Sequence, residues 1–277
     1  MVLDGHIHLM QYTTPLPGLL GNMSAGGFDG GVLLSLPPAA FPEIAPPCPA
    51  DARLEHVLAW CAGSPELFPF FWIDPLEEDA LAQVELACGR GIAGFKVICD
   101  RYFPSDERAL VVFRAIARVG KPILFHSGIL WDGKPSSRYN RPVEFEALLE
   151  VPGLRFAMAH ISWPWTDELL AVYGKFADAL RRRPELGVEL FIDLTPGTPV
   201  VYRYEALRKL LTIGYDLKRN VFIGSDSILP DSDPAGMREW LAGERRLFRQ
   251  LRLSEEDEVA FLGGNLRRFL GLEKMPE

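Results

Sequence analysis

Short apolar runs rich in β-branched and aromatic residues recur along the whole chain. They occupy residues 2–8, 31–36, 69–74, 92–98, 122–127, 154–160, 187–194 and 220–226. Runs of this length and composition predict eight buried β-strands. Between most of them the apolar positions follow helical spacing, most clearly over residues 54–61, 81–88, 110–117 and 169–180. After the first strand the helix is less clear, because Pro15, Pro17 and the glycines around Gly26 interrupt the pattern.

Eight strands that alternate with helices predict a parallel α/β sheet, because parallel neighbours need a crossover connection. The simplest closure of eight such units is a single (β/α)8 TIM barrel that takes up residues 1–277 as one domain. An open, doubly wound sheet is the alternative. However, no G-x-G-x-x-G loop follows the first strand, which ends in histidines instead.

An extra helical segment is expected at the carboxyl terminus. Residues 237–250 fit the last barrel helix, and Ser254, followed by three acidic residues, is expected to begin another. The glycines at 263–264 are expected to end that helix. Asn265 is expected to cap a final helix, 266–270, packed on the outside of the barrel.

Charge and composition exclude several classes of protein. The chain carries 29 Lys and Arg against 37 Asp and Glu, a net charge of −8, so a nucleic-acid partner is not expected. Neither a signal peptide nor an apolar run long enough to span a bilayer is present, which predicts a cytoplasmic protein without a membrane partner. The four cysteines lack zinc-site spacing and are expected to be reduced. A small-molecule substrate is expected, and a homodimer is compatible with the sequence.

Four of the five histidines stand at carboxyl ends of predicted strands. Because residues i and i+2 of a strand share a face, His6 and His8 are expected to point together into the barrel mouth. The same alternation is expected to bring His126, His160 and Asp226 there, with Asp226 on the eighth strand beside the first. Four imidazoles and a carboxylate suit a divalent ion, most of all Zn²⁺, with Mn²⁺, Fe²⁺ or Co²⁺ as alternatives. One ion is expected rather than two.

Two further polar residues, His56 and Asp193, are not among the predicted metal ligands. His56 lies off the apolar stripe of its predicted helix and is expected to face solvent. Asp193 ends the seventh strand, where it is expected either to contact the substrate or to cap and support neighbouring groups.

Two predicted loops at the same rim carry aromatic and basic side chains. Trp131, Arg138 and Arg141 follow the fifth strand, and Trp163 and Trp165 follow the sixth. Rigid aromatic rings suit a flat or carboxylated substrate, which Arg138 or Arg141 would clamp as an anion. The alternative is that the two sixth-strand tryptophans only pack the junction between strand and helix.

Together these motifs resemble the amidohydrolase superfamily, in particular its family 2. The run D-G-H-I-H at 4–8, the strand-end His126 and His160, Asp226 in G-S-D-S and the closing G-G-N-L-R-R-F-L-G-L carry the resemblance over the full chain. The resemblance implies that the two first-strand histidines, His126 and Asp226 bind metal. It implies that His160 either binds a second metal or orients and polarises the substrate.

Lys96 stands where several branches of this superfamily have a carboxylated lysine that bridges two metals. It could alternatively be a bare ammonium that binds a substrate carboxylate, or a structural lysine. Family 2 members often carry this lysine uncarboxylated, which favours a single metal.

The resemblance implies metal-assisted hydrolysis of an amide, lactone or ester in a small, carboxylated or aromatic substrate. The ion would lower the pKa of water toward about 7. Asp226 would then carry a proton to the leaving group, while His160 would hydrogen-bond the substrate carbonyl or the attacking water. The same family also contains non-oxidative decarboxylases of aromatic or unsaturated carboxylic acids, which is the alternative. A third reading is a non-catalytic barrel that binds a metal or ligand.

Overall fold

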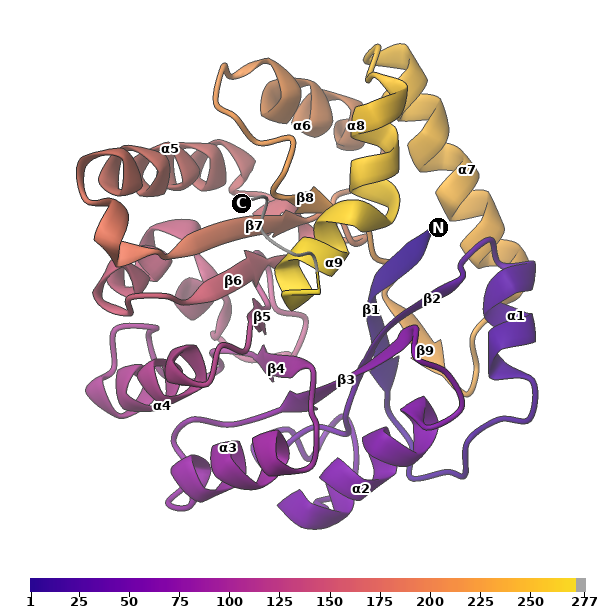
Figure 1. Cartoon of the computed structure of the whole chain (residues 1–277), viewed down its shortest axis with the longest axis vertical. Coiled ribbons are helices and arrows are strands. Elements are labelled where there is room, and N and C mark those ends of the chain that lie inside the picture. Colours follow the sequence, from indigo (N-terminus) through magenta and orange to yellow (C-terminus); the bar gives the residue numbers. More distant parts are fainter. Residues whose placement is uncertain (273–277) are drawn as a thin grey trace.

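A computed structural model describes residues 1–272, in which strands and helices alternate (Figure 1). The strands are β1 (Leu3–Leu9), β2 (Gly30–Leu34), β3 (Leu67–Trp72), β4 (Gly94–Val97), β5 (Ile123–Phe125), β6 (Arg155–Met158), β7 (Glu189–Asp193), β8 (Val221–Phe222) and β9 (Ser227–Leu229). The α-helices are α1 (Leu19–Ala25), α2 (Ala50–Cys61), α3 (Ala80–Gly89), α4 (Glu107–Arg118), α5 (Thr166–Arg182), α6 (Val200–Thr212), α7 (Pro234–Gln250), α8 (Glu255–Val259) and α9 (Asn265–Leu270). Shorter helical turns are η1 (Ser137–Asn140), η2 (Pro142–Glu150), η3 (Ala159–Ser162), η4 (Pro184–Leu186) and the π-helical η5 (Ala260–Gly264). Within this described part, no helix has the length and apolar character that a membrane crossing requires.

The sheet closes into a barrel of parallel strands in the order β8-β7-β6-β5-β4-β3-β2-β1-β9. β8 and β9 lie close together on one segment of the chain. β8 pairs with β7, and β9 pairs with β1. Between them, Ile223 O accepts from Gly5 N at 2.9 Å and Asp226 N donates to His6 O at 3.0 Å, so the closure is continuous. The predicted barrel is confirmed. The eighth strand, however, is interrupted rather than continuous over 220–226, and Asp226 lies in the interruption.

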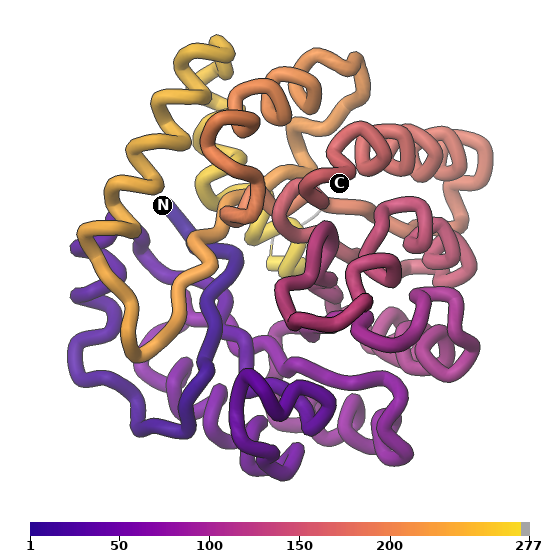
Figure 2. Tube along the Cα trace, turned by 180° about the vertical axis from the view of Figure 1, so that it is seen from behind, coloured from indigo at the N-terminus to yellow at the C-terminus, as the bar shows by residue number. Residues whose placement is uncertain are grey.

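An apolar cluster fills the inside of the barrel, separate from the larger cluster between sheet and helices. Phe269 of α9 reaches into it, with ring centroids 6.3, 5.1 and 5.3 Å from those of Phe70, Phe191 and Phe222. The expectation that the last helix packs on the outside is therefore wrong, because its apolar face plugs the amino-terminal end of the barrel. Figure 1 looks at this plugged end, and Figure 2 looks at the opposite end, where the strands finish.

The carboxyl-terminal segment also differs in its caps. Ser254 begins α8 as expected, and its side chain accepts a backbone hydrogen bond. The glycines at 263–264 do not end that helix, which continues through η5 into α9. Asn265 does not cap α9, because its Nδ2 instead donates to Lys218 O and Val221 O, at 2.7 and 2.6 Å. These two hydrogen bonds connect the carboxyl-terminal helices to the residues just before and at the start of β8.

His56 is buried in α2, with only 6% of its surface exposed, so the expectation that it faces solvent is wrong. The segment after β1 folds back over it. Nε2 of His56 and Nε1 of Trp60 lie 2.8 and 3.2 Å from Thr13 O, and the imidazole stacks on Tyr12 with centroids 4.8 Å apart. His56 therefore ties this loop to α2.

Replacing His56 by Ala is expected to lower the free energy of unfolding by about 1–3 kcal/mol, because it leaves a cavity and a lost hydrogen bond. Burial lowers the pKa of His56 below its ordinary 6.5, so the unfolded chain takes up the proton more readily. The difference in free energy of unfolding between wild type and the variant should therefore decrease as the pH falls below 6.5. Thermal unfolding at pH 7.5 and 5.5 measures both effects. An unchanged Tm would show that the contacts of His56 with Tyr12 and Thr13 do not stabilise the fold.

Candidate active site

A cavity of about 820 Å³ opens at the carboxyl-terminal end of the barrel. His8, His126, His160 and Asp226 line it. His6 lies fully buried beside them, its Nε2 3.1 Å from Nε2 of His8. The structure thus brings together all five residues that the sequence predicted as metal ligands.

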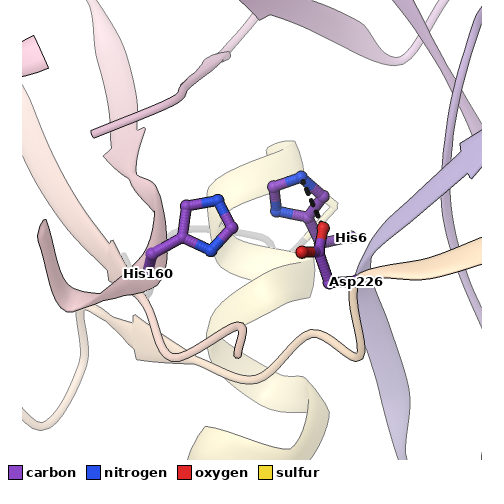
Figure 3. Close-up of side chains that lie close together, drawn as sticks. All are labelled: His6, His160 and Asp226. Carbon is purple, nitrogen blue, oxygen red and sulfur yellow. Dashed lines mark ion pairs between the residues drawn. The ribbon is translucent and has the colours of Figure 1, made fainter. Parts of the chain in front are cut away.

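Potential ligand atoms of His6, His160 and Asp226 all lie within 4.8 Å of one another (Figure 3). Oδ1 of Asp226 is 3.7 Å from Nε2 of His6 and 3.4 Å from Nε2 of His8. Two ligands on one zinc ion, each about 2.0–2.1 Å from it, stand roughly 3 Å apart. The donor types suit a divalent ion, and their separations make this a possible site for one after small side-chain shifts.

Asp193 fixes the orientation of His6. Its Oδ2 lies 2.8 Å from Nδ1 of His6, and both side chains are completely buried. Its Oδ1 accepts from the backbone N of Thr195 at 2.8 Å and from the Thr195 hydroxyl. Because a carboxylate only accepts, Nδ1 of His6 carries the proton and Nε2 keeps its lone pair. Of the two roles the sequence left open for Asp193, this geometry fits the supporting one.

Backbone carbonyls orient two of the other three imidazoles in the same way. Nδ1 of His160 lies 2.6 Å from Pro196 O, and Nε2 of His126 lies 3.1 Å from Ile129 O. Carbonyls accept only, so these nitrogens are protonated, which leaves a lone pair on Nε2 of His160 and on Nδ1 of His126. The two rings are neighbours, with centroids 4.9 Å apart.

The electrostatic surroundings favour neutral imidazoles and an ionised carboxylate. Burial and the charge of Lys96 push the pKa of His6 well below 6.5, and burial also lowers the pKa values of His126 and His160. Burial alone would raise the pKa of Asp226, but the hydrogen bond of His8 and the nearby imidazoles hold it well below its ordinary value. These are the protonation states that metal binding requires.

His160 reaches the cavity by a route that strand alternation does not predict. Phe156 and Met158 pack in the outer cluster, so alternation would turn His160 outward as well. Instead β6 ends at Met158, and residues 160–162 adopt left-handed φ values of 62°, 50° and 52°. The loop after β7 packs closely against the side chain of His160 at Gly197. Only glycine allows this approach, since a Cβ at position 197 would lie 2.7 Å from Cβ of His160.

Lys96 points inward from β4, with 1% of its surface exposed and Nζ 3.4 Å from Nε2 of His6. Burial lowers its pKa to about 8, although the charges of Asp226 and Asp193 act in the opposite direction. Lys96 is not one of the residues that line the cavity. The structure therefore places it beneath the ligand cluster rather than against the cavity.

The two loops divide between the cavity and the surface. Trp131, 82% exposed, and Trp163 both line the cavity. The proline-rich segment 37–49, which leaves the second strand at this end, adds Phe41 and Ile44. Phe41 packs on Trp72, with ring centroids 5.1 Å apart, and builds an apolar wall that the histidine pattern did not indicate.

The two arginines expected to clamp an anion lie away from the cavity lining. Arg138 lies over the ring of Tyr139, 4.7 Å from its centroid, and donates to its hydroxyl at 2.6 Å. Arg141 pairs with Glu168 and lies 5.4 Å from the ring centroid of Trp165. Local aromatic and acidic partners hold both guanidiniums, so the expected clamp is absent from this site as the structure describes it over residues 1–272.

Comparison with known proteins gives a family and a set of folds. The model of the Amidohydrolase family (Amidohydro_2) matches residues 4–272. A search of curated proteins found no match. An amidohydrolase from Burkholderia multivorans with bound zinc has a TM-score of 0.67 at 14% identity, with 99% of this chain and 100% of that chain covered. A probable 2-pyrone-4,6-dicarboxylic acid hydrolase from Acinetobacter baumannii, with citric acid bound, has a TM-score of 0.62 at 13% identity, covering 98% and 99%. A 2,6-dihydroxybenzoate decarboxylase from Rhizobium has a TM-score of 0.62 at 16% identity, covering 98% of each chain.

Proposed function

The chain belongs to the amidohydrolase family, and on that premise we propose that it is a metal-dependent hydrolase that cleaves an amide, lactone or ester bond in a small organic substrate. One observation carries the proposal. Imidazole nitrogens and the Asp226 carboxylate converge at the base of a cavity, at the barrel end where the catalytic residues of such barrels lie.

Zinc is the proposed ion, since the nitrogen-rich donor set suits it and a neighbour of the same fold binds it. His6 and His8 would hold it through Nε2, His126 through Nδ1 and Asp226 through Oδ1. His160 offers Nε2 either to the ion or to the attacking water. When bound, the ion supplies Lewis acidity toward the scissile carbonyl and lowers the pKa of water.

The chain's own groups would move and hold the proton. Oδ2 of Asp226, the oxygen not given to the ion, would accept it from the attacking water and deliver it to the leaving group. His160 would accept a hydrogen bond from that water at Nε2, because its only N–H, at Nδ1, already donates to Pro196 O. A neutral His160 in this tautomer does not donate to the substrate carbonyl. Asp193 keeps Nε2 of His6 free of a proton throughout.

The reaction type is tested with a panel of uncharged and carboxylated esters, lactones, amides and aromatic carboxylic acids offered to the zinc-loaded protein. Hydrolysis products that incorporate oxygen from labelled water would support the proposal. Release of carbon dioxide from an aromatic acid would replace it with the decarboxylase alternative. No turnover across the panel at full zinc occupancy would favour a binding protein.

Replacing His126 by Ala is expected to weaken zinc binding by at least about 10-fold, because the variant loses a proposed ligand. The His56→Ala variant removes an imidazole outside the cavity and serves as the matched control. Competition with a chromogenic chelator measures both affinities. If the two variants retain zinc equally well, His126 is not a ligand.

A further inference from the structure

The cavity has a polar base and apolar walls. Its base holds His8, His126 and Asp226. Phe41, Trp72 and Ile98 form one wall and are almost completely buried, so that wall is preformed rather than folded over a ligand. A substrate in this cavity would place its reacting group at the bottom, beside the histidines and Asp226. The rest of the substrate would pack against the wall of Phe41, Trp72 and Ile98.

No lysine or arginine of the described residues belongs to the cavity lining. Lys96 lies beneath His6, and Arg138 and Arg141 are held by partners outside the lining. Apart from a metal at the bottom of the cavity, the nearest described cation at the rim is Lys134, and Glu43 already pairs with it.

The outer part of the cavity is acidic. Glu43 and Asp132 both line it, next to the exposed Trp131. Nζ of Lys134 is 2.9 Å from Oε1 of Glu43 and compensates that carboxylate. Oδ1 of Asp132 accepts only the neutral donors Lys134 N and Ser136 Oγ, at 3.0 and 2.7 Å. The two carboxylates and Lys134 together carry a net charge of −1.

From this lining we infer that the substrate is apolar and uncharged at the end remote from its scissile bond. This inference rests on the proposed hydrolase function and narrows its substrate class. A carboxylate at the remote end would lose water against the apolar wall and meet a rim where Glu43, Asp132 and Lys134 sum to a charge of −1. Of the carboxylated or aromatic substrates that the sequence predicted, this inference keeps the aromatic ones and excludes those with a carboxylate at the remote end.

The test uses two hydroxamic acids that bind zinc through the same group and differ only at the far end. Biphenyl-4-carbohydroxamic acid is uncharged there, and its 4′-carboxylate is anionic. Calorimetric titration of the zinc-loaded protein is expected to give an affinity about tenfold or more higher for the uncharged probe. Equal affinities, or tighter binding of the carboxylate, would overturn the inference.

Two variants identify the source of the discrimination. Asp132→Asn is expected to reduce the affinity ratio of the two probes several-fold, mainly through better binding of the carboxylated one. Glu85→Gln removes one negative charge from the exposed surface of α3 and is expected to leave the ratio unchanged. An equal change in both variants would mean that net charge, not the cavity, decides. A protein that takes up no zinc would overturn both proposals, and a zinc-loaded protein without hydrolysis in the panel would overturn the proposed function. Equal binding of the two probes by a zinc-loaded, active hydrolase would overturn this inference alone.

Discussion

Replacing Asp226 by Asn is expected to leave most of the zinc bound and to lower kcat by a factor of about 10²–10⁴. The amide keeps the shape of the side chain and one oxygen that can coordinate, but it lacks the basicity needed to accept a proton from water. Steady-state kinetics on a substrate found by the panel, together with zinc analysis of the same samples, measures the two effects separately.

The Asp226→Ala variant is the control for this prediction, because it removes both the ligand oxygen and the base. It is expected to lose zinc as well as turnover. An Asn variant with full zinc and near-normal kcat would show that another group moves the proton. His160, with its free Nε2 in the same cluster, would then be the first alternative.

Replacing Asp193 by Asn is expected to lower zinc affinity by about 100-fold, the upper end of the range for residues that orient ligands. The Thr195 N–H and hydroxyl would hold the amide oxygen, which turns the NH₂ toward Nδ1 of His6. An NH₂ group can only donate there, so the proton of His6 would move to Nε2 and block the ligand atom. Chelator competition measures the affinity, and ¹⁵N chemical shifts of His6 report the tautomer.

Asp74→Asn is a matched control, since Asp74 is likewise a buried carboxylate near the carboxyl end of a strand but pairs with Arg101 outside the ligand cluster. It is expected to bind zinc as wild type does. Wild-type affinity in the Asp193 variant, or an unchanged His6 tautomer, would refute the orienting role of Asp193.

The barrel and its ligand-bearing strands could be predicted from sequence because both depend on short-range regularities. Apolar runs locate the strands, and the period of two correctly directs His6 and His8 inward together. The same rule does not apply to His160, whose neighbours Phe156 and Met158 pack outside. Three consecutive left-handed residues turn its side chain inward, and no local pattern of residue types indicates such a turn.

Side-chain contacts that the residue pattern does not indicate, most of them between distant parts of the chain, decided the positions that the sequence did not predict. The apolar face of α9 gave no indication of whether it would cover the outside of the barrel or plug its end. His56 looked exposed because the loop that covers it is more than 40 positions away in the chain. Arg138 and Arg141 have the right chemistry for an anion, but neighbouring aromatic and acidic groups hold them away from the cavity.

The most direct test of the central claim is the metal content of the native protein. Protein purified without chelators or a histidine tag, supplemented with zinc and freed of excess by gel filtration, is analysed for metals by elemental mass spectrometry. The convergence of His6, His8, His126, His160 and Asp226 predicts one ion per chain. A content below about 0.2 equivalents would contradict the metal site and the hydrolase function that depends on it.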